Sequence, residues 1–183
     1  MGRAQNVDVR ALEQTNLTDQ EESHQSPEGF EAFFHREYPG LARALYLVTG
    51  SGPEAEDLVQ EAMARALERW PRVRVMESPA GYVYRIAVNL HRRRLRRVFR
   101  ETPAPESTAP VDSDPTEIAE IREEVLRALG CLSTDQRIAL VLVEWLGLSP
   151  EEAGQVLGIK AVSVRGRLHR ARATLKECLG RTR

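Results

Sequence analysis

The stretch that most constrains the fold runs from Ser149 to Leu179 and has the pattern of two helices joined by a tight turn. Ser149 and Glu152 have the spacing of a capping box, with Pro150 at the first helical position. Gly158 stands where a left-handed residue is expected after the end of a helix. The spacing therefore predicts a helix-turn-helix whose first helix is short.

The second helix of this motif is expected to begin near Ala161, with an apolar seam on one side and a basic surface on the other. The seam advances by four, three and four residues and comprises Val164, Leu168, Ala171 and Leu175. Between residues 160 and 183 there are eight basic residues and a single acid. Such a helix suits the DNA major groove, although a solvated helix of a small bundle would show a similar pattern.

Charge is distributed unevenly along the 183 residues, although the net charge is only −1. Residues 28–100 carry a net charge of +4 and residues 125–183 carry +5, whereas residues 101–124 between them carry −7. Two basic blocks on either side of an acidic segment suggest two modules that face nucleic acid.

The composition argues against several other classes of protein. Cys131 and Cys178 are far apart, belong to no CxxC pattern and do not cluster with the four histidines, so neither a zinc site nor a structural disulfide is expected. No apolar run is long enough to span a membrane, and no signal peptide begins the sequence. A reduced, cytoplasmic protein without a cofactor is therefore predicted.

Three helices are predicted in the first half of the chain, after a polar leader over residues 1–26 that reads as disordered. The periodicity predicts helices over 27–50, 53–70 and 80–100, with a loop bounded by prolines over 71–79. The second of these helices has the cleanest amphipathic pattern and a polar outer face. Its apolar stripe comprises Ala55, Leu58, Val59, Ala62, Met63, Ala66, Leu67 and Trp70.

Six arginines fall within nine residues near the end of the third helix, and no acid lies among them. They are Arg92, Arg93, Arg94, Arg96, Arg97 and Arg100. Like charges at this density repel one another unless a polyanion neutralises them. Phosphate contact is therefore favoured over a role in solubility alone.

Residues 101–116 are rich in proline, serine and acids and predict a flexible linker. Two more helices, over 117–129 and 133–145, precede the helix-turn-helix, and the apolar run IALVLVEWLG is expected at the centre of the four-helix unit that results. The predicted fold is all-α, with two small helical domains, 27–100 and 117–180, on a flexible acidic tether. No strand pattern is present in the sequence.

Several motifs in this order resemble the extracytoplasmic-function (ECF) group of bacterial RNA polymerase sigma factors, in the sigma-70 family. They are AEDLVQEAMARALERW at 55–70, AGYVYRIAVNLHRRRLRR at 80–97 and VRGRLHRARATLKECL at 164–179. The resemblance covers about 28–180 and implies a sigma-2 domain before the linker and a sigma-4 domain after it. It implies a protein that is not an enzyme, binds core RNA polymerase and directs promoter-specific transcription initiation.

The resemblance also implies three interfaces and a class of partner. The outer face of the helix over 53–70 docks on core polymerase through Asp57, Gln60, Glu61 and Arg65. The −10 element is read through a flipped non-template base held near Asn89, with further contacts from Tyr82, Arg85, Arg92, Arg93, Arg96 and Arg97. The −35 element is read in the major groove by Lys160, Ser163, Arg165, Gly166, Arg167 and Arg170. A repressing partner, an anti-sigma factor, is common in the family.

This sequence departs from the pattern of the family at several of these positions. Tyr82 stands where tryptophan is usual, and Arg93 stands where an acid is common. Lys160 replaces a frequent proline, and Gly166 replaces the usual serine, which costs up to ~1 kcal/mol of helix propensity. The last two departures bear on the −35 contacts and leave the fold unchanged.

Two other classes of protein compete with this interpretation. A free-standing helix-turn-helix regulator would bind duplex DNA without polymerase, but it would have no use for the polar face of the helix over 53–70. An all-helical enzyme would need a convergent set of catalytic groups or a phosphate-binding glycine loop, and the sequence shows neither.

Overall fold

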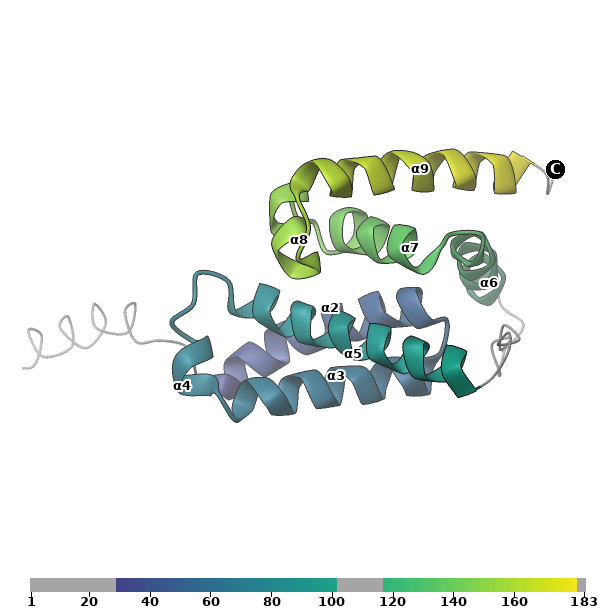
Figure 1. Cartoon of the computed structure of the whole chain (residues 1–183). Helices are drawn as coiled ribbons and strands as arrows, with labels where there is room; N and C mark the ends of the chain where they lie inside the picture. Colours follow the sequence, from purple (N-terminus) through teal and green to yellow (C-terminus); the bar gives the residue numbers. More distant parts are fainter. Residues whose placement is uncertain (1–28, 102–116, 181–183) are drawn as a thin grey trace, which may run out of the picture.

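The computed structural model describes residues 29–101 and 117–180, so the predicted leader and nearly all of the predicted linker lie outside the described residues. All regular structure within the described residues is helical. Figure 1 shows two stacked helical units, one from each part of the chain.

The first unit comprises α2 (Phe30–Thr49), α3 (Gly52–Leu67), α4 (Trp70–Val73) and α5 (Pro79–Glu101). The three helices predicted in this half are therefore confirmed to within a few residues. The short α4 lies in a segment that the prolines predicted to be a loop. It is held in place by ring packing, because Trp70 lies 4.9 Å from Phe33 between ring centroids.

α3 begins with a capping interaction and buries one face. Ser51 accepts a hydrogen bond from the backbone N–H of Glu54, and Pro53 stands in the first turn, where it is tolerated. The predicted apolar stripe is buried at Ala55, Leu58, Val59, Ala62, Met63 and Ala66. Leu67, which the pattern also assigned to the stripe, is 53% exposed because α3 ends at this residue.

The second unit comprises α6 (Glu117–Gly130), α7 (Thr134–Leu140), the π-helical turn η1 (Val141–Trp145), α8 (Pro150–Leu157) and α9 (Ala161–Gly180). The helix predicted over 133–145 is therefore α-helical as far as Leu140 and π-helical from Val141 to Trp145.

The apolar run that crosses α7 and η1 was expected at the centre of the second unit, and this expectation is only partly right. Ile138, Ala139, Val141 and Leu142 are buried, whereas Trp145 is 51% exposed. In η1 the Leu146 N–H donates to the Val141 carbonyl at 3.1 Å, which spans five residues and not the usual four. The extra residue in this turn changes which side chains face inward.

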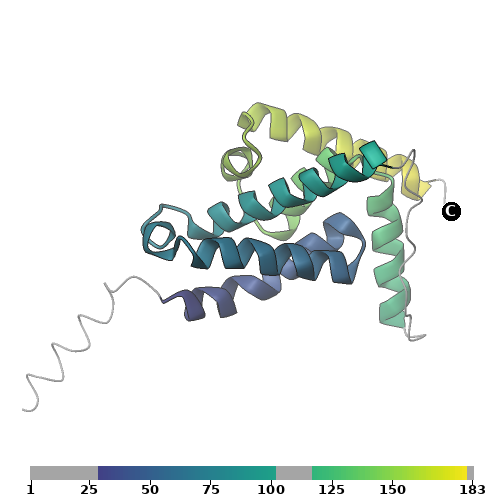
Figure 2. The same cartoon turned by 60° about the horizontal axis from the view of Figure 1, so that its bottom comes forward.

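The two units share one hydrophobic core, which two modules on a tether would not require. Side chains of α2, α3 and α5 form a single buried cluster with Ile138, Leu142, Val156 and Val164 of the second unit. α5 packs on α8, and α2 packs on η1. Figures 1 and 2 both show the second unit lying against the first along these helices. No helix among the described residues is long and apolar enough to cross a membrane.

A disulfide joins Cys131, in the turn after α6, to Cys178, near the end of α9. The expectations of no structural disulfide and of reduced cysteines were therefore wrong. α9 packs on both α7 and α6, and this packing brings the two Cα atoms to 6.6 Å, within the range that a disulfide needs. A separation of 47 residues gives no such signal in the sequence.

Candidate nucleic-acid and protein interfaces

α8 and α9 form the predicted helix-turn-helix. Both arms of the capping box are present, since the Ser149 Oγ accepts from the Glu152 N–H at 3.2 Å and a Glu152 carboxylate oxygen accepts from the Ser149 N–H at 2.7 Å. The hydrogen bond from the Ser149 N–H to this carboxylate is the main reason why the pKa of Glu152 lies below its ordinary value. Gly158 ends α8 with φ 68°, in the left-handed region that favours glycine.

The turn between these helices leaves no room for a side chain at Gly154. A Cβ atom at this position would lie 2.7 Å from the carbonyl oxygen of Ile159, which is backbone and cannot move easily. A Cβ atom at Gly166 of α9 would lie 3.6 Å from the end of the Arg170 side chain, which is ordinary contact. Close packing therefore requires glycine at position 154, whereas position 166 has room for a larger side chain.

We expect alanine to have opposite effects at these two positions. Gly154→Ala should lower the free energy of unfolding by about 1–3 kcal/mol, because the added methyl group forces the turn apart. Gly166→Ala should raise it by up to about 1 kcal/mol, because alanine is the better helix former. Urea unfolding followed by circular dichroism measures both, and effects of the same sign would contradict the geometry.

The apolar seam predicted for α9 is confirmed. Val164, Leu168 and Ala171 are buried, and Leu175 is half-buried. The six −35 candidates lie on or next to the other side of this helix. Four of them are exposed and two are half-buried; the exposed ones are Lys160, Ser163, Arg165 and Arg170, and the half-buried ones are Gly166 and Arg167.

Two of these arginines already have partners within the second unit. Arg165 pairs with Glu151 of α8. Arg167 pairs with Asp135 of α7 at 2.9 Å. Arg170 has no ion pair with a residue that the structure describes, so its guanidinium is the least engaged of the three.

The −10 candidates lie along α5. Tyr82 and Arg92 are half-buried, and the rest are exposed: Arg85, Asn89, Arg93, Arg96 and Arg97. Three of the exposed residues, Arg85, Asn89 and Arg93, are four residues apart and so follow one another along one side of the helix. The Asn89 amide makes no side-chain hydrogen bond to the described part of the chain, so it is available to a partner.

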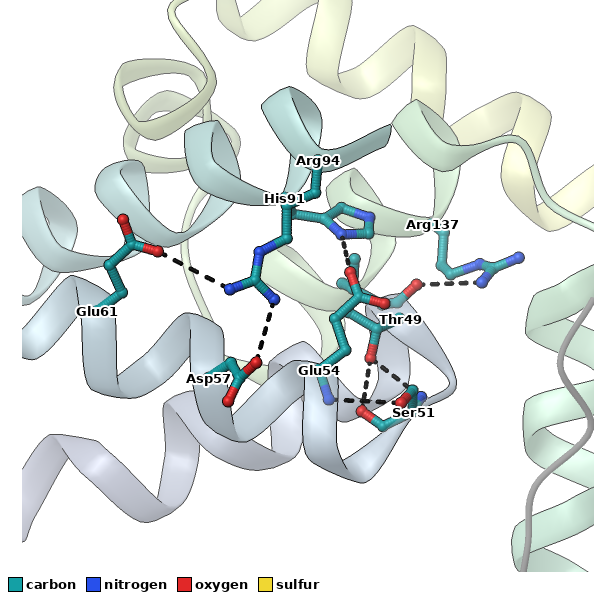
Figure 3. A network of polar contacts seen from close by, with 9 residues as sticks. Thr49, Ser51, Glu54, Asp57, Glu61, His91, Arg94 and Arg137 are labelled. Atoms are coloured by element: carbon teal, nitrogen blue, oxygen red, sulfur yellow. Dashed lines mark hydrogen bonds and ion pairs between the residues drawn. The ribbon is translucent and has the colours of Figure 1, made fainter. Parts of the chain in front are cut away.

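The four candidates for polymerase contact lie on the polar side of α3. Asp57 and Gln60 are exposed, and Glu61 and Arg65 are half-buried and paired at 2.6 Å. Arg94 reaches across from α5 to Asp57 at 3.6 Å and to Glu61 at 3.8 Å, as Figure 3 shows. One member of the arginine run is therefore turned toward the acids of α3.

Sequence reasoning missed a polar pair beneath this face. His91 is buried, and its Nδ1 lies 3.2 Å from a carboxylate oxygen of Glu54 (Figure 3). This hydrogen bond is the main reason why the pKa of Glu54 is lowered. His91 lies four residues after the buried Ala87, so its position on the apolar side of α5 was the available signal.

Asp135, in the first turn of α7, is a second residue that sequence reasoning missed. One carboxylate oxygen lies 3.0 Å from Arg92 of α5, and the other lies 2.9 Å from Arg167 of α9. A single side chain therefore connects a −10 candidate with a −35 candidate. An acid in the first turn of a helix is common, so the sequence carried no signal for this role.

The two helical units each match a described region of one protein family. Residues 33–101 match the region described as Sigma-70 region 2, and residues 122–175 match Sigma-70, region 4. The first match lies in the unit formed by α2 to α5, and the second lies in the unit formed by α6 to α9.

Individual relatives agree with this match. The chain is 34% identical over 152 residues to the ECF RNA polymerase sigma factor SigM of Mycobacterium tuberculosis, covering 82% of this chain and 77% of that protein. It is 33% identical to the RNA polymerase sigma-E factor of Streptomyces coelicolor, covering 81% and 84%. The sigma factor RpoE, solved in complex with the anti-sigma factor NepR from Bartonella quintana, superposes with a TM-score of 0.70 at 25% identity, covering 84% of this chain and 98% of that one.

A two-unit helical chain with both sigma-70 regions in this order is a transcription initiation factor. The chain belongs to the ECF group of RNA polymerase sigma factors, in the sigma-70 family. The resemblance stated from the sequence is thereby confirmed.

Proposed function

We propose that this sigma factor binds core RNA polymerase through the polar face of α3 and directs it to promoters that α5 and α9 read. The observation that carries the proposal is the pair of exposed basic helix faces, one in each unit, on α5 and on α9. The protein acts by binding and not by catalysis, and it works in the cytoplasm with its polymerase.

The arrangement of α9 supports the assignment of the −35 element to this helix. Its seam is buried against the rest of the second unit, and its opposite side presents Arg165 and Arg170 to solvent. Arginine can bind two acceptors of guanine at once, which suits base reading in the major groove. The tight turn at Gly154 and Gly158 sets the angle at which α9 would enter the groove.

The arrangement of α5 supports the assignment of the −10 element. Asn89 is exposed between Arg85 and Arg93 on one side of the helix. An amide can donate to and accept from the edge of one base, which suits the reading of a flipped base. The neighbouring arginines would hold the phosphates of the opened strand.

An anti-sigma factor is proposed as a further partner. Two solved relatives support it, since the sigma factor RpoE was solved with NepR and CnrH was solved with the cytosolic domain of CnrY. The CnrH structure superposes with a TM-score of 0.60 at 26% identity, covering 82% of this chain.

The polymerase interface is tested by replacing its two exposed members together. We expect Asp57→Ala with Gln60→Ala to weaken binding to core polymerase about tenfold or more, because truncation at the centre of an interface often costs over 1 kcal/mol. Exposed positions contribute little to folding, so stability should change by less than about 0.5 kcal/mol. Titration of labelled sigma factor with core polymerase measures the affinity.

Glu31→Ala provides the control, because it removes an exposed acid from the first turn of α2 and leaves α3 untouched. Its affinity for polymerase should match that of the wild type. An unchanged affinity in the double variant would refute the α3 assignment. Tight, sequence-specific binding of duplex DNA without polymerase would instead favour the free-standing regulator.

A further inference from the structure

We propose that Asp135 is an internal latch that holds the two DNA-contacting helices in a closed arrangement of the free protein. Its carboxylate binds Arg92 of α5 with one oxygen and Arg167 of α9 with the other. In this state the Arg92 pair spans the two units, and both guanidinium groups are already bound to a carboxylate. The inference rests on the DNA roles proposed above for α5 and α9.

The exposure of these side chains distinguishes the two latched arginines from the others. Arg92 and Arg167 have 23% and 19% of their side-chain surface exposed, whereas all the other arginines proposed to contact DNA are exposed to solvent. The Arg92 pair crosses from one unit to the other, whereas the Arg167 pair lies within the second unit. Asp135 therefore binds one arginine from each of the two helices proposed to read DNA, α5 and α9.

The Arg167 guanidinium is bound incompletely in this state. Its Nη1 is buried and has no hydrogen-bond partner in the described part of the chain. A buried donor without a partner costs free energy, so this guanidinium gains a hydrogen bond when it leaves for a phosphate or a base edge. The Arg167–Asp135 pair can therefore be exchanged for a contact with DNA.

A second polar contact closes the same interface. Arg137 of α7 donates to the backbone carbonyl of Val48 in α2 at 3.1 Å. Burial lowers the pKa of Arg137, and its Nε has no partner among the described residues. The Arg137 guanidinium has lost contacts with water and has not replaced all of them with hydrogen bonds. The interface is therefore less stable than one in which this group is fully hydrogen-bonded.

The apolar part of the interface is also imperfectly packed. A cavity of about 20 Å³ lies between the units, lined by Leu41, Leu45 and Val88 from the first unit and by Ile138, Leu142 and Leu146 from the second. Side chains that border an empty space lose dispersion contacts. The units therefore share one core that has a gap about the size of a water molecule where they meet.

DNA is the partner that would open this arrangement. Asp135 is 51% exposed, so phosphates can compete with it for both guanidinium groups. Added salt weakens the attraction between its carboxylate and these groups. A nucleic-acid strand offers many phosphates in place of one carboxylate. Separating the units breaks the Asp135 pair with Arg92 but leaves the pair with Arg167 intact within the second unit, so phosphate must displace the carboxylate from each arginine in turn.

Asp135→Asn in the full chain tests the latch, because it removes the charge and keeps the shape. Small-angle X-ray scattering of the free protein should show a larger radius of gyration than that of the wild type. Fluorescence anisotropy at low salt should show that affinity rises about threefold to tenfold for two probes, a single-stranded oligothymidine and a mixed-sequence duplex. Asp135→Ser, a second neutral side chain at the same position, should behave in the same way, and circular dichroism of both variants checks that the helices are intact.

Glu151→Gln is the matched control. Glu151 and Asp135 each stand two residues after the serine of a capping box, and each pairs with an arginine of α9. The Glu151 pair with Arg165 lies within the second unit, so its loss should leave the radius of gyration and the affinity for oligothymidine unchanged. The control thus separates the loss of an acid from the opening of the interface.

The latch is wrong if Asp135→Asn leaves the radius and both affinities at wild-type values, or if Glu151→Gln expands the chain equally. In that event, unchanged binding of the same samples to core polymerase would show that the proposed function still holds. Expansion without any gain in DNA affinity would also overturn the proposal. It would show that Arg92 and Arg167 do not have the DNA-binding roles given to them.

Discussion

Removing the disulfide between Cys131 and Cys178 should lower the free energy of unfolding by about 4 kcal/mol. The bond links residues 47 apart, and the loop that it closes contains α7, η1, α8 and most of α9. The link restricts the unfolded chain over this whole segment, so its loss stabilises the unfolded state more than the folded one. Replacing both cysteines by serine and following urea unfolding by circular dichroism measures the effect.

Without the disulfide, local opening of the folded protein should be greatest in the outer half of α9. Few described residues hold this half, since the second buried cluster comprises Leu129, Leu132 and Ala171, with Leu47, Leu140 and Leu175 packed against it. Hydrogen exchange should therefore increase most near the end of α9 and in the turn after α6.

A reducing agent provides the control for this prediction. It should shift the unfolding midpoint of the wild type toward that of the double serine variant, and it should leave the variant unchanged. A wild-type midpoint that does not respond to a reducing agent would show that the bond contributes nothing to stability. A variant that responds would assign the effect to something other than these cysteines.

The parts of the fold that the sequence predicted well are those governed by local rules. The capping box at Ser149 and the left-handed Gly158 depend on residues within one turn of each other, and both are present. The stripe of α3 and the seam of α9 depend on helical periodicity, which also acts over short distances. Helix positions and buried faces could therefore be read before the structure.

The parts that the sequence did not predict depend on how distant elements meet. His91 and Glu54 pair because α3 and α5 run side by side, and Cys131 meets Cys178 because α9 folds back to α6. The contacts of Asp135 require that the two units share an interface at all. Each of these residues has an ordinary local context, so single-sequence periodicity gives no reason to pair them.

The candidate site shows the same division. The sequence grouped the arginines after Asn89 by their proximity in the chain, and the structure distributes them in different directions. Arg93 and Arg96 face solvent, Arg94 contacts the acids of α3, and Arg92 contacts Asp135. The side of the helix on which each arginine lies follows from its position in the sequence. The partner that it contacts on that side depends on tertiary packing.

The two helices proposed to read DNA, α5 and α9, should be separable by promoter preference, and the effect should be among the largest that single substitutions produce. If Arg165 or Arg170 contacts a base, alanine at that position should cost about 1–3 kcal/mol and relax preference at one −35 position. If it contacts phosphate alone, the loss should be similar for all sequences, and the salt slope should fall by about one unit. Asn89→Ala should leave −35 preference unchanged and relax one −10 position on the non-template strand.

Transcription by polymerase carrying each variant, over promoter libraries randomised separately at −35 and −10, measures these preferences. Arg170 is the stronger candidate for base contact, because it has no ion pair with a described residue, whereas Arg165 must first leave Glu151. Glu151→Gln should therefore strengthen the contribution of Arg165 and leave that of Arg170 unchanged. A change of −35 preference in Asn89→Ala would refute the assignment of the modules, as would a change confined to −10 in both arginine variants. Equal, sequence-independent losses in all three would mean that these residues contact the backbone and that other side chains read the bases.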